Sequence, residues 1–561
     1  MQLVAYGVQD VYLTGNPQIT YWKVIYKRHT NFAVEPIEQS FSGTADFGKS
    51  SVTSLIARNG DLMSKVYLKA TVSLQLKNNN PAASFAFVRR IGHAMIKEVE
   101  IQIGGARIDR QLGDWMNVWY ELTHDISKEA GYAKMIGDTP ELTVLSNTTK
   151  RATLFIPLYF WFNRNNGLAL PLIALQYHDV RINFIFNPAS QLVVYDHASS
   201  ISNQIQASID DAILLIDYVF LDSEERKRFA TSAHEYLIEQ LQTPDQDTIN
   251  EQNKKYRLPF NHPCKEIIWN MNFGKYITGQ KFLAYHPTDF TEIQLQIAKA
   301  IVLLSINFTD KWKFSTETKP WASHSFASSA LNTLLHKLQG GVSLITIPGQ
   351  DNTASFPAEA FEMNPFNYVE FSNTGYYTTN ISLELASTTL AELTASSGTY
   401  ALGNTITGSN IFSLLTDFFP TVYMPFNYGL YIDGSTNAFE QANIQLNGQD
   451  RFTYREGDYF NYVQPYQCHT RVPCDGVNVY SFALNPEEHQ PSGTCNFSRI
   501  DFSQLNLKLT NTAKSSLGDS SVIYIYTINY NILRIMGGMG GLAYSNAGGM
   551  GGFDFDGVKS W

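Results

Sequence analysis

The hydrophobic pattern along the chain is mostly that of short β-strands. Apolar, β-branched and aromatic residues alternate with polar ones, or form short apolar runs. The clearest stretches are 66–74, 99–103, 180–186, 212–220, 266–270 and 522–530. Clusters of Gly, Asn, Asp and Pro separate them, as at 58–61, 104–105 and 163–167. Many short strands divided by turns predict β-sandwiches, so we expect an all-β fold.

Two segments have the pattern of short helices. Residues 114–122 form the first candidate. The second covers residues 222–229, where Asp222 or Ser223 can serve as the N-cap and two glutamates stand in the first turn. Both predict isolated helices set into a β-rich protein.

The strand pattern divides the chain into two halves of similar length, which suggests a duplicated sandwich although the letters show no repeat. Residues 350–415 are rich in Ser, Thr, Asn and Gly and contain no Lys or Arg, so we expect long surface loops there. The expected organisation is an N-terminal segment (1–30), a first sandwich (31–240), a linker (241–260), a second sandwich with these loops (261–535) and a Gly/Met-rich tail (536–561).

The charge balance narrows the function. The formal net charge is −10, with 16% charged residues. A protein that coats nucleic acid needs a basic stripe, so we expect no direct nucleic-acid binding. One basic cluster near the start contains Lys23, Lys27, Arg28 and His29. Its plain interpretation is a solvated face, and its alternative is a contact with an acidic partner or membrane surface.

The N-terminus and the cysteines give no sign of secretion or metal binding. Residues 1–7 lack a basic and an apolar signal-peptide region, and no apolar run approaches the ~20 residues of a membrane span. The four cysteines are Cys264, Cys468, Cys474 and Cys495. They do not have the spacing of a zinc site, so we expect free thiols and no bound metal.

Two glycine motifs resemble nucleotide-binding loops. Residues 43–50 fit the phosphate loop, and Asp217 ends an apolar strand as a Mg²⁺-binding Asp would. A phosphate loop must open a helix, whereas residues 51–56 have a strand pattern, so we predict a turn between strands. The alternative is an NTPase that uses this loop. Nucleotide binding by the protein that disappears in Lys49→Ala would indicate it. Residues 538–543 fit a dinucleotide motif but leave no room for the helix and second strand it needs.

Other candidate sites are weaker. Acid pairs occur at 224–225 and 487–488, and a glycosidase or carbohydrate-binding sandwich would need two such carboxylates facing each other across a cleft. We assign no catalytic, cofactor or metal residue. Asn-x-Ser/Thr occurs at Asn147, Asn307, Asn380 and Asn496, which are candidate glycosylation sites. Asn380 is the strongest of them because it lies in the polar loop segment.

Several uncommon strings occur in order along the chain. They cover residues 3–20, 115–122, 167–178, 221–226, 234–238, 261–266 and 477–501, and include WMNVWYEL, GLALPLIALQYH and YSFALNPE. Together they closely resemble the major capsid proteins of nucleocytoplasmic large DNA viruses, the group of phycodnaviruses, iridoviruses and mimiviruses. The resemblance runs from residue 3 to about residue 546.

The resemblance implies a structural protein of the virion with a double jelly roll, two eight-stranded antiparallel sandwiches side by side. It further implies a homotrimer that forms a pseudo-hexameric capsomer, and neighbouring capsomers that tile an icosahedral shell around an internal membrane. The N-terminal segment would lie on the inner side, near minor capsid proteins, with the internal membrane as a further candidate partner. Residues 350–415 would project outward, and no cofactor is implied.

Overall fold

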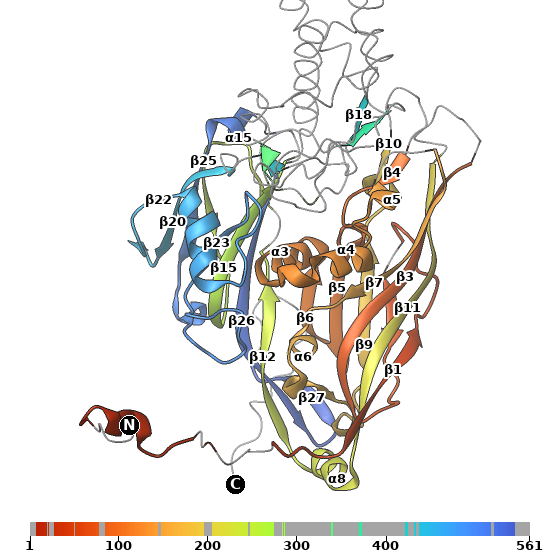
Figure 1. Cartoon of the computed structure of the whole chain (residues 1–561), viewed down its shortest axis with the longest axis vertical. Helices are drawn as coiled ribbons and strands as arrows, with labels where there is room; N and C mark the ends of the chain where they lie inside the picture. The colour runs from red at the N-terminus through yellow and green to blue at the C-terminus, as the bar shows by residue number, and fades with distance from the viewer. Residues whose placement is uncertain are drawn as a thin grey trace, which may run out of the picture.

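A computed structural model describes most of the first half of the chain and parts of the second. The described residues are 7–18, 21, 27–49, 51–77, 85–143, 147–195, 205–244, 247–273, 283, 285, 338–339, 370–372, 421–423, 431–432, 437–515, 517 and 521–544. Figure 1 shows two sandwiches side by side, with helix α3 (Gly113–Thr123) between them. Most strands of both sandwiches run along the long axis of the molecule.

The first sandwich consists of two antiparallel sheets. One has the order β1 (Phe32–Ser40), β11 (Ile205–Leu221), β3 (Leu62–Leu76), β7 (Lys150–Pro157). The other has the order β2 (Val52–Leu55), β9 (Val180–Phe186), β5 (Ile96–Ile103), β6 (Ala106–Leu112). Short strands add to them: β8 (Leu170–Pro171) pairs with β3, and β4 (Phe85–Phe87) pairs with β10 (Val193–Tyr195). Every second residue of β9 is buried in the core between the sheets, as the alternating pattern predicts.

The second sandwich is also built from two sheets. One has the order β12 (His234–Gln242), β26 (Val522–Met536), β15 (Pro263–Asn272), β23 (Asn478–Ser481). The other has the order β14 (Asn253–Arg257), β25 (Ser503–Leu509), β20 (Phe439–Leu446), β21 (Gln449–Asp450), with β22 (Arg455–Glu456) also on β20. Shorter strands are β13 (Asp247–Thr248) and β27 (Met539–Leu542) on β26, β24 (Cys495–Asn496) on β15, and the pairs β16 (Leu338–Gln339) with β19 (Tyr431–Ile432) and β17 (Glu370–Ser372) with β18 (Thr421–Tyr423).

The two sandwiches share one strand order. In each, the first principal strand pairs with the last, the last with the third, and the third with the sixth. The facing sheet joins the second, seventh, fourth and fifth strands, where β21 and β22 together form the fifth strand of the second sandwich. This is the order of a jelly roll. The predicted all-β double sandwich is therefore confirmed.

The helices are short and lie between strands. Both predicted helices are present, as α3 and as α8 (Ser223–Thr231), whose first turn contains Glu224 and Glu225. Among the described residues, the other helices and single turns are α1 (Asp10–Thr14), α2 (Ile91–Ala94), α4 (Glu129–Ile136), α5 (Pro140–Thr143), α6 (Trp161–Arg164), α7 (Ala189–Leu192), α14 (Gln464–Cys468), α15 (Asn511–Ser515), η1 (Ile126–Lys128), η2 (Asn166–Leu168), η3 (Leu172–Ala174), η6 (Tyr459–Val463) and η7 (Phe497–Arg499).

The strands differ from the predicted organisation in three places. β12 pairs with β26, so the chain passes to the second sandwich at α8 and not at residue 240. The expected linker 241–260 holds β13 and β14. The expected tail 536–561 begins with β27, because Gly537 and Gly538 adopt positive φ and turn the chain back onto β26. Apart from 370–372, the segment 350–415 lies outside the described residues.

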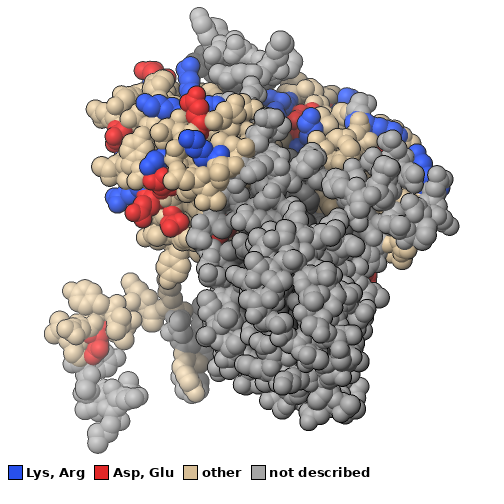
Figure 2. All heavy atoms as spheres, turned by 90° about the horizontal axis from the view of Figure 1, so that it is seen from above, with Lys and Arg blue, Asp and Glu red and all other residues tan. Residues whose placement is uncertain are grey.

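Surface charges are mixed where the structure can be viewed from above. Figure 2 shows lysine and arginine side chains among aspartate and glutamate side chains on the left part of this face. Within the described surface on that side, charge of both signs is interspersed, which limits the field of either sign.

Candidate functional site at the junction of the two sandwiches

An apolar cluster centred on α3 joins the two sandwiches. Its first-sandwich members are Leu112, Trp115, Val118, Trp119 and Leu122, and its second-sandwich members include Ile268, Val477, Val479, Tyr524, Tyr526 and Ile528. The Trp115 ring lies 5.5 Å from that of Trp119 and 5.2 Å from that of Tyr526. Residues Gly113 to Leu122 are all buried, because α3 packs on its own sheet and against the other sandwich.

The start of α3 requires a glycine. A Cβ atom at Gly113 would lie 2.1 Å from the carbonyl oxygen of Ile96 and 2.3 Å from that of His93. No side chain fits such a distance, so only glycine lets the helix begin this close to the preceding backbone. The close approach sets where α3 lies between the sandwiches.

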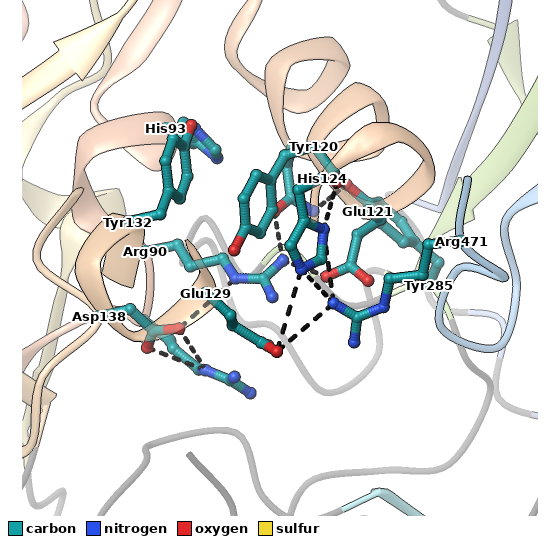
Figure 3. A network of polar contacts seen from close by, with 12 residues as sticks. Arg90, His93, Tyr120, Glu121, His124, Glu129, Tyr132, Asp138, Tyr285 and Arg471 are labelled. Atoms are coloured by element: carbon teal, nitrogen blue, oxygen red, sulfur yellow. Dashed lines mark hydrogen bonds and ion pairs between the residues drawn. The ribbon is translucent and has the colours of Figure 1, made fainter. Parts of the chain in front are cut away.

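Beside α3 lies a buried set of charged residues, shown in Figure 3. We call it the junction network; its charged and titratable members are Arg89, Arg90, Glu121, His124, Glu129, Asp138 and Arg471. The Arg89 Nε atom lies 2.9 Å from Asp138 Oδ1. Arg90 donates to Glu121 and, at 2.6 Å, to Asn117 Oδ1. Buried ions require such complete pairing.

Arg471 connects the network to the second sandwich. Its backbone N–H donates to the Leu122 carbonyl at 3.1 Å, and its guanidinium donates to His124 Nε2 and lies 3.6 Å from Glu129 Oε2. Since His124 Nε2 accepts, the proton of a neutral His124 is on Nδ1, which lies 2.7 Å from the Tyr120 carbonyl. One arginine of the second half thus binds the end of α3 through both backbone and side chain.

Two buried groups at the junction, Glu121 and the neighbouring His93, keep one protonation state near neutral pH. Burial alone would raise the pKa of Glu121, but Arg90 and Arg471 outweigh it and hold that pKa at about 2. Burial and the nearby Arg90 lower the pKa of His93 to about 3, so its imidazole is neutral at pH 7. The Nε2 atom of this neutral ring lies 2.7 Å from Tyr132 Oη. Groups with pKa values this far from neutrality suit a structural contact better than acid–base chemistry.

A second ionic contact surrounds Glu239 on β12. Lys265 Nζ donates to Glu239 Oε1 at 2.7 Å, and Arg164 of the first sandwich donates to Glu239 Oε2. Arg164 also lies over the Trp119 ring, 4.9 Å from its centre. Burial raises the pKa of Glu239, but Arg164, His489 and Lys265 outweigh it and lower that pKa to about 2. Both ionic contacts therefore join side chains from the two halves.

The glycine motif at 538–543 makes the third contact between the sandwiches. The hairpin of β26 and β27 reaches the first sandwich, where Tyr177 donates its backbone N–H to Gly538 O at 2.9 Å. A Cβ at Gly540 would lie 2.7 Å from Leu175 Cδ2. The motif is thus a hairpin that approaches a neighbouring backbone, and no helix follows it within the described residues.

The phosphate-loop match is a turn, as predicted. Gly43 and Gly48 adopt positive φ, Ser42 bridges to Thr53, and the chain continues into strand β2. Lys49 lies 3.5 Å from Asp46, within the loop itself. This geometry does not open a helix toward a phosphate.

The remaining sequence candidates are dispersed. Glu224 and Glu225 lie in α8, whereas Glu487 contacts His469 and Thr470. Cys264, Cys468, Cys474 and Cys495 are free thiols, and no cluster of three metal-ligating side chains occurs among the described residues. Asn147 and Asn496 are exposed, and Asn496 Oδ1 accepts from Ser498 N at 3.1 Å. Asn307 and Asn380 lie outside the described residues.

His469, which stands beside Cys468 in the sequence, is a buried cation between two glutamates. Its two ring nitrogens lie 2.9 Å from Glu266 Oε2 and 3.0 Å from Glu487 Oε1. Burial would lower its pKa, but Glu266 and then Glu487 raise it to about 9. The ring therefore donates from both nitrogens at neutral pH.

We expect this histidine to make stability depend on pH. Its folded pKa of about 9 lies above the unfolded value of 6.5, so its contribution is full below pH 6.5 and is lost as pH rises through 9. The slope is at most about 1.4 kcal/mol per pH unit. Urea unfolding of the wild type and of His469→Gln at pH 6, 7.5 and 9 measures it. An equal slope in the two proteins would contradict the assignment.

Comparisons with known proteins agree with this architecture. Residues 20–222 match the family model "Major capsid protein N-terminus", and residues 225–541 match "Large eukaryotic DNA virus major capsid protein". The chain belongs to the major capsid proteins of large eukaryotic DNA viruses. The two matches meet at α8, where strand pairing also passes from one sandwich to the other.

Similar proteins extend over nearly the whole chain. Capsid protein 1 of Acanthamoeba polyphaga mimivirus is 41% identical, with 97% of this chain and 99% of the relative covered. The major capsid protein of Paramecium bursaria Chlorella virus 1 is 34% identical over the same shares. The PBCV-1 VP54 crystal structure, fitted into a reconstruction of the virophage Sputnik, has a TM-score of 0.57 at 29% identity and covers 94% of this chain and 100% of its own.

Membership in this family settles the broad function. The protein is a structural subunit of a virus capsid and not an enzyme, and its place is the virion. Within the described part of the chain, no helix has the length and apolar character to cross a membrane. In such a capsid protein, the role of the junction residues is to join the two jelly rolls into one building block, through the apolar cluster on α3 and the ionic contacts of Arg471 and Glu239.

Proposed function

We propose that three copies of this chain form a capsomer with a pseudo-six-fold outline. The observation that carries the proposal is the shared strand order of the two sandwiches. Three copies of a two-sandwich chain present six similar units around one axis. A closed trimer of this kind repeats a single interface three times.

The capsomers would tile an icosahedral shell, each contacting neighbouring capsomers. In support, the structure described as "PBCV-1 virus capsid, quasi-atomic model" has a TM-score of 0.56 at 28% identity and covers 94% of this chain and 100% of its own.

The N-terminal segment 1–30 is proposed to face the inside of the shell, toward minor capsid proteins and the internal membrane. Figure 1 shows residues 7–18 projecting from the body of the molecule. Val8, Val11, Tyr12 and Leu13 of this segment are 63–88% exposed. Apolar side chains exposed together on one segment favour burial against a partner. Lys27, Arg28 and His29 of the same segment 1–30 are exposed and could meet an anionic surface, whereas Lys23 lies outside the described residues.

Two further assignments stay proposals. The outward loops are assigned to 350–415, and glycosylation to Asn380, Asn307, Asn147 and Asn496. Of these, Asn147 and Asn496 are exposed in the structure. Mass spectrometry of protein taken from virions would test the four positions.

The solution mass of the purified full-length chain tests the capsomer. We expect a mass three times that of the 63.2 kDa chain by light scattering. A chain lacking residues 1–30 should keep this mass and fail to enter complete shells. A strict monomer at high concentration would refute the trimer, and normal shells from the truncated chain would refute the inner-face role.

A further inference from the structure

A cavity of ≈ 350 Å³ lies at the junction beside the Glu239 contact. Lys65, Trp161, Arg164 and Asn166 line it from the first sandwich, and Glu239 and His489 line it from the second. Trp161 is fully buried and forms part of the wall. The cavity is large enough for a small ligand that touches both halves of the chain.

The carboxylates at the cavity already have partners. Glu239 accepts from Lys265 and Arg164, both described above. Glu487, also in the lining, accepts from the Thr470 backbone N–H at 2.7 Å and from His469 at 3.0 Å. Little acceptor capacity is therefore directed into the cavity.

Hydrogen-bond donors at the cavity, by contrast, outnumber their partners among the described residues. Lys65 donates one of its three N–H groups to the carbonyl of Asn163, and no ion pair of Lys65 with a carboxylate occurs among the described residues. Arg164 has five N–H groups and uses its Nη2 end on Glu239. Asn165 uses its oxygen to accept from Gly167, so its amide N–H groups remain to donate. A cavity with surplus cationic donors fits a ligand that is rich in acceptors and negatively charged.

We propose that this cavity binds a compact oxyanion, a phosphate or small carboxylate, which bridges the two jelly rolls. Lys65 and Arg164 would donate from the first sandwich. From the second, His489 would donate through Nε2, because its Nδ1 lies 3.5 Å from Glu239 Oε1. Trp161 would exclude water on one side, which strengthens the charged hydrogen bonds. Since both sandwiches supply donors, binding would stabilise the two-sandwich unit in proportion to ligand occupancy.

The test is thermal unfolding of the full-length protein in sodium phosphate, sodium citrate and sodium chloride at matched ionic strength and pH 7. We expect phosphate or citrate to raise the unfolding temperature above that in chloride, with saturation. Which of the two acts at lower concentration identifies the preferred oxyanion. Because phosphate and citrate also strengthen burial of apolar surface in any protein, the variants decide the result.

Lys65→Gln keeps a donor for the Asn163 carbonyl and removes the positive charge. We expect this variant to raise the apparent Kd for the oxyanion roughly tenfold or more, since hydrogen bonds to charged groups contribute about 1.5–3 kcal/mol. Lys69→Gln is the matched control, because Lys69 lies on the same strand β3 and pairs with Glu38 outside the cavity. A shift of the same size in wild type, Lys65→Gln and Lys69→Gln would overturn the proposal, as would no shift beyond chloride.

Discussion

Arg90→Ala is expected to lower the free energy of unfolding by about 3–5 kcal/mol, the cost of breaking a buried ion pair by removing one partner. The change leaves Glu121, whose side chain is 2% exposed, without its main cation. It also removes a cation from Asp138, which still pairs with Arg89. Urea unfolding of the purified protein measures the loss.

Arg534→Ala is the control for this prediction. Arg534 pairs with Glu235 at 2.8 Å between β26 and β12, but both side chains are more than half exposed, so the loss should be about 1 kcal/mol or less. If Arg90→Ala costs no more than Arg534→Ala, the buried ion pairs of Arg90 do not stabilise the fold as expected. A loss of unfolding free energy between these two values would mean that the ion pairs of Arg90 contribute less than about 3–5 kcal/mol.

Strands and helices that are buried on a regular face could be predicted from the sequence. Residues 180–186 alternate between buried and partly exposed positions, so the period of two is visible in the letters. Residues 522–530 are almost all apolar or aromatic because β26 is covered on both faces by other parts of the molecule. The helix predicted at 114–122 agrees with α3 (Gly113–Thr123) within one residue at each end. Its apolar residues lie on all sides of the helix, because α3 is buried on all sides.

β14 was missed for a physical reason. It is an edge strand with the sequence Asn253 to Arg257, and only Tyr256 is buried. Exposed edge strands carry charged residues that discourage pairing with other chains, and such a strand has the composition of a polar linker. The second sandwich therefore begins earlier in the chain than the composition indicates.

The junction network could not be found from local patterns. Arg90 and Asp138 are far apart in the sequence, and Arg471 comes from the other half of the chain. Single charged residues have no periodicity, so only the fold brings them together. The strings that carried the family resemblance do contain junction residues, including Trp115, His178 and Glu487. Their uncommon composition reflects close contacts between two sandwiches.

Trp115→Ala is expected to cost about 3–5 kcal/mol of unfolding free energy, the usual range for removing a large buried aromatic side chain. Trp115 is 3% exposed, and its ring contacts Trp119 on its own helix and Tyr526 on the second sandwich. The cavity left behind would lie between the sandwiches and not inside either one. We therefore expect amide hydrogen exchange to increase first in α3, β15 and β26.

The control is Tyr466→Ala, which removes an aromatic side chain that is 81% exposed and should change stability by less than about 0.5 kcal/mol. Exchange in β1 and β11, in the sheet of the first sandwich that does not contain β5 and β6, provides an internal reference within the same protein. Faster exchange confined to α3 and the junction strands would show that α3 couples two sandwiches that are otherwise complete. Equal acceleration in β11 would instead mean that Trp115 supports the core of its own sandwich.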